Sequence, residues 1–385
     1  MTAVVLSEIY PPAIGGSGEF LHNVYARLQG IDVVVSTEPA EEEPADVPPH
    51  LRIVRENIHA DAWGLASPSA LIHHVRRAAQ IRRTSRGPST VVHCARALPE
   101  GVDAWMARMS GGAPYVCWAH GEDIASARTS REFDWLNRRV LQGASAVVAN
   151  SRNTAAMARA CGVRASKVVV VYPGVDVERF RPGVPGADHV RARLAGADVP
   201  LLLTVGRLQR RKGHDLTLEA VAVLRDLGYR LRYVIVGDGA DRDRLVQMVK
   251  TLELDETVVF TGAVPAEDLP LYYAAADVFC HPNRVDGADI EGFGIVFLEA
   301  AASGLPVIGG NSGGVPEAIA AGETGVLVDG ASVEDLAAAI RRLISDGRGM
   351  GLAGRARVVR DFSWERAAAT VADVHRRIVR DHGVE

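Results

Sequence analysis

The chain has few cysteines, and their spacing matches no common metal-binding or disulfide motif. Its 385 residues include four cysteines. They lie far apart, form no Cys-x-x-Cys pair and have no histidine at the spacing of a zinc site. We therefore expect unpaired and mostly packed thiols in a reducing cytoplasm. The cysteines are Cys94, Cys117, Cys161 and Cys280.

The sequence also lacks an excess of positive charge and any long apolar stretch. With 43 basic and 47 acidic side chains the formal net charge is -4, which gives no reason to expect a nucleic-acid partner. No segment approaches the roughly 20 apolar residues that span a bilayer, and the first residues have no basic leader. We expect a cytoplasmic protein that at most touches a membrane from one side.

Short β-branched runs do occur, and each is followed by a helix-like stretch. The first set is Val4–Ser7, Ile31–Ser36, Thr90–His93, Tyr115–Ala119, Ala146–Ala149 and Val168–Val171. The second set is Leu201–Val205, Arg232–Val236, Thr257–Phe260, Val278–Cys280, Pro306–Ile308 and Gly325–Val328. Apolar strands that alternate with helices indicate parallel sheets covered on both faces. Two sets predict an α/β protein with two doubly wound, Rossmann-like domains.

Proline and glycine mark the break between the two sets. Residues 180–186 read FRPGVPG, a strong interruption of the pattern. We place the domains at residues 1–182 and 183–363. A final helix begins after Ser363, a plausible N-cap, and continues to about Arg380. This segment, 364–385, has to dock on structure that is already built.

The segment from Glu291 to Glu299 reads EGFGIVFLE and is the most informative motif. If a helix covers 293–302, Glu291 lies in the loop before it and Glu299 about two turns inside it. Unpaired carboxylates would be costly among these apolar residues, so both need partners, and ligand hydroxyls are suitable ones. The turn at 292–294 leaves backbone N–H groups for polar ligand atoms. The spacing alone equally allows Glu299 to be a structurally paired helix residue.

A second motif follows the predicted strand that ends at Val205. Arg207 and Lys212 project where parallel sheets place ligands, and two cations there suit a diphosphate. We interpret Arg210 and Arg211 as solvated neighbours.

The other motifs are weaker when taken singly. Residues 11–18, PPAIGGSG, follow the first strand, and their glycines allow a ligand to approach the backbone. His120 ends a buried strand, although a lone histidine is more often structural. Residues 236–239, VGDG, lack a third glycine and are interpreted as a tight turn. Asp286 and Asp289 lack the Asp-x-Asp spacing of a metal site, so we predict no required metal.

Taken together, these motifs resemble the retaining glycosyltransferases of family 4, which have the GT-B fold. The resemblance covers nearly the whole chain and includes the segments 206–213, 236–239, 291–299, 300–308 and 312–317. In the first half it includes residues 11–16, 120–121 and 173–176. The segment 289–296 is most similar to bacterial mannosyltransferases of the phosphatidyl-inositol mannoside type.

The resemblance implies a role for each matching position. Arg207 and Lys212 would hold the diphosphate of the donor, and Glu299 would bind its ribose. Glu291 would face the transferred sugar. The remaining donor contacts would come from Gly16 on the distal phosphate, His120 beside the sugar, Ala263 and Val264 near the base, and backbone N–H groups of Phe293, Gly294 and Ile295.

The resemblance also implies a reaction. A hexosyl group would move from a nucleotide sugar, GDP-mannose in preference to a UDP-hexose, to a hydroxyl acceptor, with retained configuration and no cofactor. The first domain would bind the acceptor and receive the C-terminal helix across a cleft. The alternatives are a GT-B epimerase, a phosphorylase with a pyridoxal cofactor, or a non-catalytic binding protein. The basic helix at 71–83 leaves peripheral membrane contact open.

Overall fold

The computed structural model describes residues 1–13, 15–40, 47–59, 63–196 and 198–382. The chain forms two compact units, Met1–Gly174 with Trp364–Glu385, and Val175–Ser363. The first unit thus ends before the predicted boundary at residue 182. The reason is local, because the N–H of Val175 donates to the carbonyl of Phe362 at 3.0 Å within the second unit.

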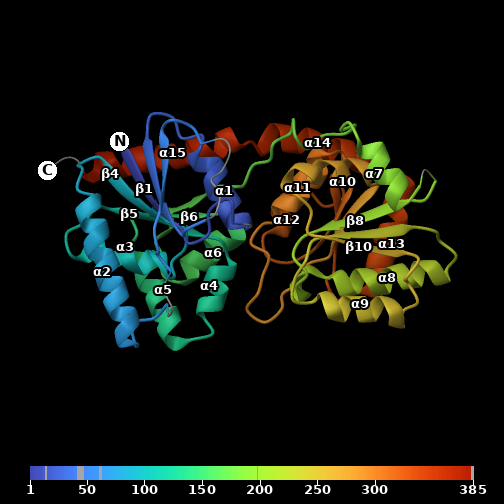
Figure 1. Cartoon of the computed structure of the whole chain (residues 1–385), viewed down its shortest axis with the longest axis horizontal. Coiled ribbons are helices and arrows are strands. Elements are labelled where there is room, and N and C mark those ends of the chain that lie inside the picture. The colour runs from blue at the N-terminus through green and yellow to red at the C-terminus, as the bar shows by residue number, and fades with distance from the viewer. Residues whose placement is uncertain (14, 41–46, 60–62, 197, 383–385) are drawn as a thin grey trace. The chain divides into compact units, whose positions relative to one another are not determined.

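A parallel sheet forms the centre of the first unit (Figure 1). It has seven strands in the order β3-β2-β1-β4-β5-β6-β7. Strand β3 was not predicted from the sequence. Two arginines interrupt its apolar residues, and it lies at an edge of the sheet, where one side needs no apolar partner. The strands are β1 Thr2–Leu6, β2 Asp32–Thr37, β3 Leu51–Arg55, β4 Thr90–Cys94, β5 Tyr115–Ala119, β6 Ala146–Ala149 and β7 Val168–Val170.

Helices connect and cover these strands. Helix α2 packs on α3, α3 packs on α5, and α1 packs against α15. All four cysteines of the chain are free and buried. The helices of this unit are α1 Gly16–Tyr25, α2 Pro68–Thr84, α3 Glu100–Met109, α4 Glu122–Ala127, α5 Arg131–Gly143, α6 Arg152–Ala160 and α15 Trp364–His382, with a short 3-10 turn η1 Ala165–Lys167.

The second unit has a six-stranded sheet, also parallel, in the order β10-β9-β8-β11-β12-β13. Its strands are β8 Leu201–Val205, β9 Arg232–Val236, β10 Val258–Gly262, β11 Val278–His281, β12 Val307–Gly310 and β13 Gly325–Val328. Its helices are α7 Ala187–Leu194, α8 His214–Asp226, α9 Arg242–Thr251, α10 Leu269–Ala275, α11 Ile295–Ala302, α12 Val315–Ala318, α13 Val333–Asp346 and α14 Arg348–Asp361, with 3-10 turns η2 Arg210–Lys212 and η3 Ala266–Asp268.

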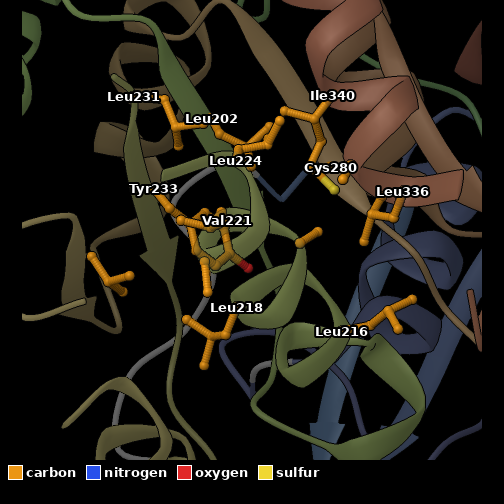
Figure 2. Packing of buried hydrophobic residues seen from close by; sticks show 14 of the residues in the cluster. Leu202, Leu216, Leu218, Val221, Leu224, Leu231, Tyr233, Cys280, Leu336 and Ile340 are labelled. Carbon is orange, nitrogen blue, oxygen red and sulfur yellow. The ribbon is translucent and has the colours of Figure 1, made fainter. Parts of the chain in front are cut away.

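Apolar side chains of α8 and α13 fill the core beneath this sheet. Figure 2 shows Val221 and Leu224 of α8 beside Tyr233 of β9, and Ile340 of α13 beside Cys280 of β11. All five side chains are fully buried or nearly so. The side chains of α8 and α13 therefore hold the strands in place. The polar groups are carried by the loops at the carboxyl ends of the strands.

The order of the strands reverses once in each sheet. Strand β1 lies between β2 and β4, and β8 lies between β9 and β11. After each of these central strands the chain first adds strands on one side of the sheet and then returns to add strands on the other side. In open parallel sheets this reversal opens a crevice at the carboxyl ends of the two central strands. The loops after β1, β4, β8 and β11 are consequently the places to look for function.

A buried polar chain ties the C-terminal helix to the first sheet. The indole N–H of Trp118 donates to the Tyr25 hydroxyl oxygen at 2.9 Å, and that hydroxyl lies 2.9 Å from Nδ1 of His93. The Nε2 of His93 lies 3.1 Å from Nδ1 of His375 on α15. One proton order satisfies all three contacts: Tyr25 donates to His93, and His93 donates to His375. Both imidazoles are then neutral.

We predict that acid weakens this attachment. Burial lowers the pKa of His375 to about 4, with the N-terminal ammonium and Arg376 acting in the same direction. The unfolded chain therefore binds this proton first, so the stabilisation is complete above about pH 6.5 and is lost as the pH falls toward 4. The loss should be on the order of 1–3 kcal/mol for this group.

Urea unfolding between pH 4 and 8 measures this slope. The variant His375→Gln should show a shallower acid slope than the wild type. The variant His382→Gln, at the exposed end of the same helix, should keep the wild-type slope. Equal slopes for both variants would contradict the assignment.

Candidate active site

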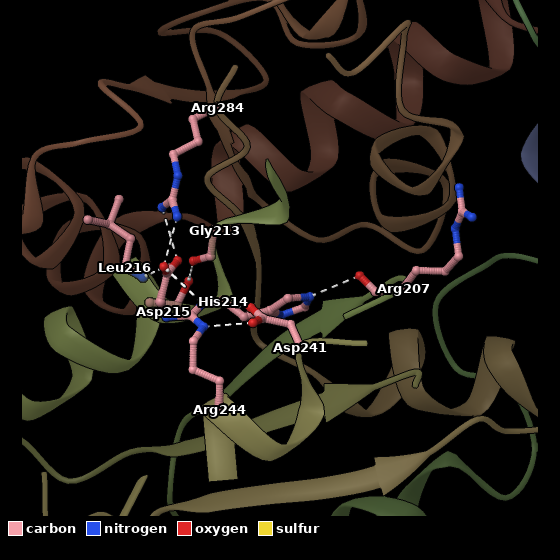
Figure 3. Close-up of polar contacts among 9 residues, drawn as sticks. Arg207, Gly213, His214, Asp215, Leu216, Asp241, Arg244 and Arg284 are labelled. Atoms are coloured by element: carbon pink, nitrogen blue, oxygen red, sulfur yellow. Dashed lines mark hydrogen bonds and ion pairs between the residues drawn. The ribbon is translucent and has the colours of Figure 1, made fainter. Parts of the chain in front are cut away.

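The loop after β8 carries the two predicted cations. Arg207 is exposed, whereas the side chain of Lys212 is only 10% exposed. The carbonyl of Arg207 lies 3.3 Å from Nε2 of His214, a buried histidine at the start of α8. Figure 3 shows the Arg207 side chain extending away from this contact, so its guanidinium is presented to solvent while its backbone is held.

A second group of charges fixes this loop to its surroundings (Figure 3). Arg284, after β11, donates to both carboxylate oxygens of Asp215 at 3.0 and 2.8 Å. Arg244, on α9, donates to Asp215 at 3.1 Å and to both oxygens of Asp241 at 2.6 Å. One carboxylate at the start of α8 thus joins three segments that are distant in the sequence.

Glu291 is buried between two cations. Its Oε2 lies 2.6 Å from Nη1 of Arg211 and 2.5 Å from Nζ of Lys212. Burial alone would raise the pKa of the Glu291 carboxyl, but Lys212 and Arg211 together lower it to about 2. Burial lowers the pKa of Lys212, and Glu291 opposes that shift. The carboxylate is therefore ionised, and its partners are side chains of the same unit.

The interpretation of Arg211 as a solvated neighbour is wrong. Its side chain is 5% exposed and also pairs with Asp289 at 2.6 Å through Nε. The cause is the 3-10 turn η2, which rotates successive residues by about 120°, so that Arg210 faces solvent while Arg211 and Lys212 face inward. Arg210 is exposed, as predicted.

Glu299 occupies a different environment. Helix α11 begins at Ile295 instead of Phe293, so Glu299 lies about one turn inside it, not two. Its Oε2 accepts a hydrogen bond from the Tyr273 hydroxyl at 2.7 Å. Glu299 thus has at least one structural partner and is partly exposed.

The residues between the two glutamates form the start of α11. Gly294 is its N-cap at φ +88°, and a β-carbon there would come within 2.6 Å of the Phe297 ring. Phe293 is buried, with its ring centroid 5.9 Å from that of Phe362. The first N–H groups of a helix have no intrahelical acceptor. The N-terminal end of α11, which begins at Ile295, therefore offers backbone N–H donors to a ligand.

The remaining candidate positions of the second unit follow strands β9 and β10. Ala263 and Val264 directly follow β10, and Ala263 is exposed. Gly237 and Gly239 lie where a side chain would collide with the backbone of Gly206 and Leu208. That close approach explains the VGDG segment as a tight turn.

In the first unit, Gly16 begins helix α1 and is exposed. A β-carbon at Gly16 would have no described atom within 4 Å, whereas one at Gly18 would lie 2.9 Å from the carbonyl of Ile9. Packing within the described part of this unit therefore requires glycine at position 18 but not at position 16. Close approach of a ligand is one reason to have glycine at position 16.

His120 follows β5 and is fixed on two sides. Its Nε2 lies 3.1 Å from the carbonyl of Ala95, and its ring stacks on Trp118 with an interplanar angle of 9°. Burial lowers the pKa of His120, and Asp123 opposes that shift. In the neutral ring Nε2 donates to Ala95, which leaves Nδ1 as an acceptor.

Beside His120 lies a charge cluster that the motifs did not reveal. Arg96, after β4, pairs with Glu8 at 2.8 Å and with Glu100 at 3.3 Å. Glu100 is buried, and its Oε1 also accepts from the N–H of Glu8 at 3.0 Å. Charged residues directly after β1 and β4 are the signal that could have identified them.

The loop after β11 contains the two aspartates that were considered for a metal site. Asp286 and Asp289 exchange backbone hydrogen bonds at 3.0 and 2.9 Å across a tight turn. Within the described ranges no three His, Cys, Asp or Glu side chains lie close enough to share a metal ion.

Comparison with protein families divides the chain in the same way as its sheets. Residues 188–357 match the family Glycosyl transferases group 1, and residues 14–179 match Glycosyltransferase Family 4. The first match contains both cations of the β8 loop and both glutamates. The second contains Gly16 and His120.

Curated relatives extend over the same length. The chain is 32% identical to the GDP-mannose-dependent alpha-(1-6)-phosphatidylinositol monomannoside mannosyltransferase of Mycobacterium tuberculosis, over 97% of both chains. It is 36% identical to the Mycolicibacterium smegmatis protein of that name, over 70% of this chain and 72% of the other. It is 35% identical to the D-inositol 3-phosphate glycosyltransferase of Rhodococcus opacus, over 72% and 65%.

Solved structures share the fold. Sucrose-phosphate synthase from Thermosynechococcus elongatus superposes with a TM-score of 0.81 at 25% identity, over 99% of each chain. The Anabaena protein HepE, in complex with UDP and glucose, superposes with a TM-score of 0.78 at 21% identity, over 97% of this chain and 98% of the other. The chain therefore belongs to glycosyltransferase family 4, and it is a glycosyltransferase with the GT-B fold.

Proposed function

We propose that this enzyme transfers a mannosyl group from GDP-mannose to a hydroxyl of a small-molecule, glycan or lipid-linked acceptor, with retention of configuration. The observation that carries the proposal is the arrangement of Arg207, Lys212 and Glu291 after β8 and β11, where the strand order reverses. The names of the mycobacterial relatives support GDP-mannose as donor. A UDP-hexose is the second candidate, since HepE was solved with UDP and glucose.

The proposed chemistry follows from where charge develops. The bond between the anomeric carbon and the diphosphate oxygen breaks, and the acceptor oxygen forms the new glycosidic bond on the same face. The acceptor proton passes to the departing diphosphate, so no protein nucleophile is needed. Arg207 and Lys212 would stabilise the leaving group, because fixed cations aimed at developing negative charge lower the barrier.

The other site residues would complete the donor site. Glu299 would bind the ribose, and Ala263 and Val264 would contact the base. Gly16 would approach the distal phosphate, and Nδ1 of His120 would accept a hydrogen bond from the sugar.

We further propose that the reaction needs no metal ion or cofactor. Asp289 and Glu291, the carboxylates nearest the cations, already pair with Arg211 and Lys212. Two lysine or arginine cations would fill the role that a divalent ion has beside a diphosphate. We therefore expect transfer activity to persist when an excess of chelator is added to the assay.

One prediction concerns the proposed diphosphate clamp, which consists of Arg207 and Lys212. Replacing Arg207 by alanine should lower turnover at saturating donor by about 100-fold, because one preorganised electrostatic donor contributes about 3 kcal/mol. Arg210→Ala is the matched control, since it removes another exposed arginine from the same loop. Transfer is followed by mass spectrometry of the product with GDP- and UDP-sugars. Equal activity of the two variants would show that Arg207 does not bind the diphosphate.

Another prediction separates the roles of the two glutamates. Glu299→Ala should weaken binding of free GDP, because it removes the proposed ribose contact. Glu291→Ala should spare GDP binding and lower the maximal rate, since a contact made mainly in the transition state acts on turnover. Calorimetric titration with GDP and measured transfer rates give both values. The reverse pattern would mean that the two roles are exchanged.

We also propose that the enzyme works in the cytoplasm at the inner face of a membrane, and the exposed side chains of helix α2 support this location. Leu71, Ile72 and Val75 are 41–51% exposed on its first turns, and Arg76, Arg82 and Arg83 are exposed beside and beyond them. Aliphatic side chains next to arginines suit an anionic lipid surface. Among the described residues, no helix is long and apolar enough to cross a bilayer, so contact would be peripheral.

Membrane contact predicts a loss of vesicle binding. The double substitution Leu71→Ser with Ile72→Ser should weaken sedimentation with phosphatidylglycerol vesicles by about tenfold or more, because each aliphatic side chain contributes roughly 1.5–3 kcal/mol when it leaves water. Leu352→Ser, which removes an exposed leucine of the second unit, is the control. If both proteins bind equally, α2 is a solvated helix.

A further inference from the structure

Arg211 has no role in the proposed diphosphate clamp, yet it is the most enclosed cation beside Glu291. Its side chain is 5% exposed, compared with 10% for Lys212. It holds Glu291 through Nη1 and Asp289 through Nε, each at 2.6 Å. Burying a guanidinium is unfavourable unless carboxylates compensate it, so these two contacts account for its position.

Arg211 is also fixed through its backbone. Its carbonyl accepts from the N–H of Arg284 at 2.8 Å, which joins the loop after β8 to the loop after β11. A β-carbon at Gly213, two residues later, would collide with the carbonyl of Pro282, so the two loops are in close contact. The ammonium group of Lys212 is less constrained than the Arg211 guanidinium, because it is a single charge at the end of a flexible side chain.

The two cations share one carboxylate oxygen, and this creates a competition. Oε2 of Glu291 contacts both Arg211 and Lys212 in the described structure. A diphosphate that binds Lys212 must compete with Glu291 for the same ammonium group. With Arg211 present, Glu291 keeps a cation when Lys212 turns to the diphosphate. If Arg211 were absent, Lys212 would be the remaining close cation for the buried carboxylate of Glu291 and would stay bound to it.

We propose that Arg211 is a positioning residue that retains Glu291 as an ionised acceptor and thereby releases Lys212 to the donor diphosphate. The role rests on the proposed function, in which Lys212 binds that diphosphate and Glu291 faces the sugar. It divides the work of two adjacent cations: one is fixed to the protein and the other is available to the substrate.

The electrostatic surroundings of Glu291 determine the direction of the test. Lys212 and Arg211 face it from the loop after β8, and His281 faces it from the end of β11. Asp289 faces Arg211 from the other side. When Arg211 is removed, burial is opposed by fewer cations, so the pKa of Glu291 rises and its ionised form is lost at a higher pH.

The experiment compares Arg211→Met with Arg210→Met, a matched change of the exposed neighbour in the same turn. Arg211→Met should bind GDP or UDP about tenfold or more weakly, because Lys212 stays with Glu291. Its kcat should fall at a higher pH than that of the wild type as the solution is acidified, while Arg210→Met keeps the wild-type profile. Because the pKa of Glu291 is about 2 in the wild type, the profiles are recorded from about pH 8 down to the lowest pH at which each variant remains folded.

A second substitution separates this role from a merely structural one. In Arg211→Met with Glu291→Gln, Lys212 has no carboxylate competitor, so nucleoside diphosphate affinity should return to within about threefold of wild type. Glu291→Gln does not replace a lost structural contact of Arg211, so a structural role predicts no rescue. Circular dichroism and melting temperature are recorded for each variant.

If Arg211→Met fails to fold, Arg211→Lys and Asp289→Asn carry the test. The lysine should keep the wild-type acid limb and lower kcat, and the asparagine should loosen Arg211 and lower affinity without unfolding. Turnover of the wild type with any nucleotide sugar supports the proposed function independently. Unchanged pH profiles and unrescued affinity in the Arg211 variants then overturn only the role of Arg211.

Discussion

The buried carboxylate of Glu291 is the constraint on which the rest of the second unit depends. A carboxylate at that depth requires positive partners, and they come from the 3-10 turn after β8. Their approach brings the loops after β8 and β11 into backbone contact. That contact explains Gly213, opposite the Pro282 carbonyl, and a similar approach of the loop after β12 to the carbonyl of Glu291 explains Gly313; both glycines have positive φ. Charge compensation and loop shape are thus one requirement.

The strand order makes this requirement possible. Loops from β8 and β11 are neighbours because the chain passes to β9 and β10 on one side before it returns to β11 on the other. The ion pairs of Asp215 with Arg244 and Arg284 reinforce the same junction from the start of α8. Since α8 and α13 pack against the sheet, the strands that lead into these polar loops are held in place. Such preorganisation reduces the rearrangement needed when a charged donor arrives.

The sequence predicted what depends on local pattern and missed what depends on three-dimensional rotation. Twelve apolar strands were predicted because buried parallel strands have a continuous apolar pattern, whereas β3 was missed because its arginines break that pattern at an edge. Arg207, Lys212, Glu291 and Glu299 were chosen as candidates because each belongs to a segment that follows a strand or begins a helix, and their roles stay predictions. Arg211 was misjudged because a run of three cations does not show which of them a 3-10 turn directs inward. The start of α11 was displaced by two residues because Gly294, not Gly292, adopts the left-handed conformation of its N-cap.

Both units balance buried cations with carboxylates, but the two groups differ in net charge, and the difference agrees with their proposed partners. In the second unit Arg211 and Lys212 are balanced by Asp289 and Glu291, which leaves the exposed Arg207 as a positive group at the edge of the sheet. In the first unit Arg96 is enclosed by Glu8 and Glu100, so its charge is neutralised by carboxylates. Burial raises the pKa of Glu100, with Arg96 opposing it, which limits the excess negative charge. The edge of the second sheet, with the exposed Arg207, suits an anionic diphosphate. The edge of the first sheet, where Arg96 is paired with carboxylates, suits neutral hydroxyl groups, because a hydroxyl can donate to a carboxylate and accept from a guanidinium.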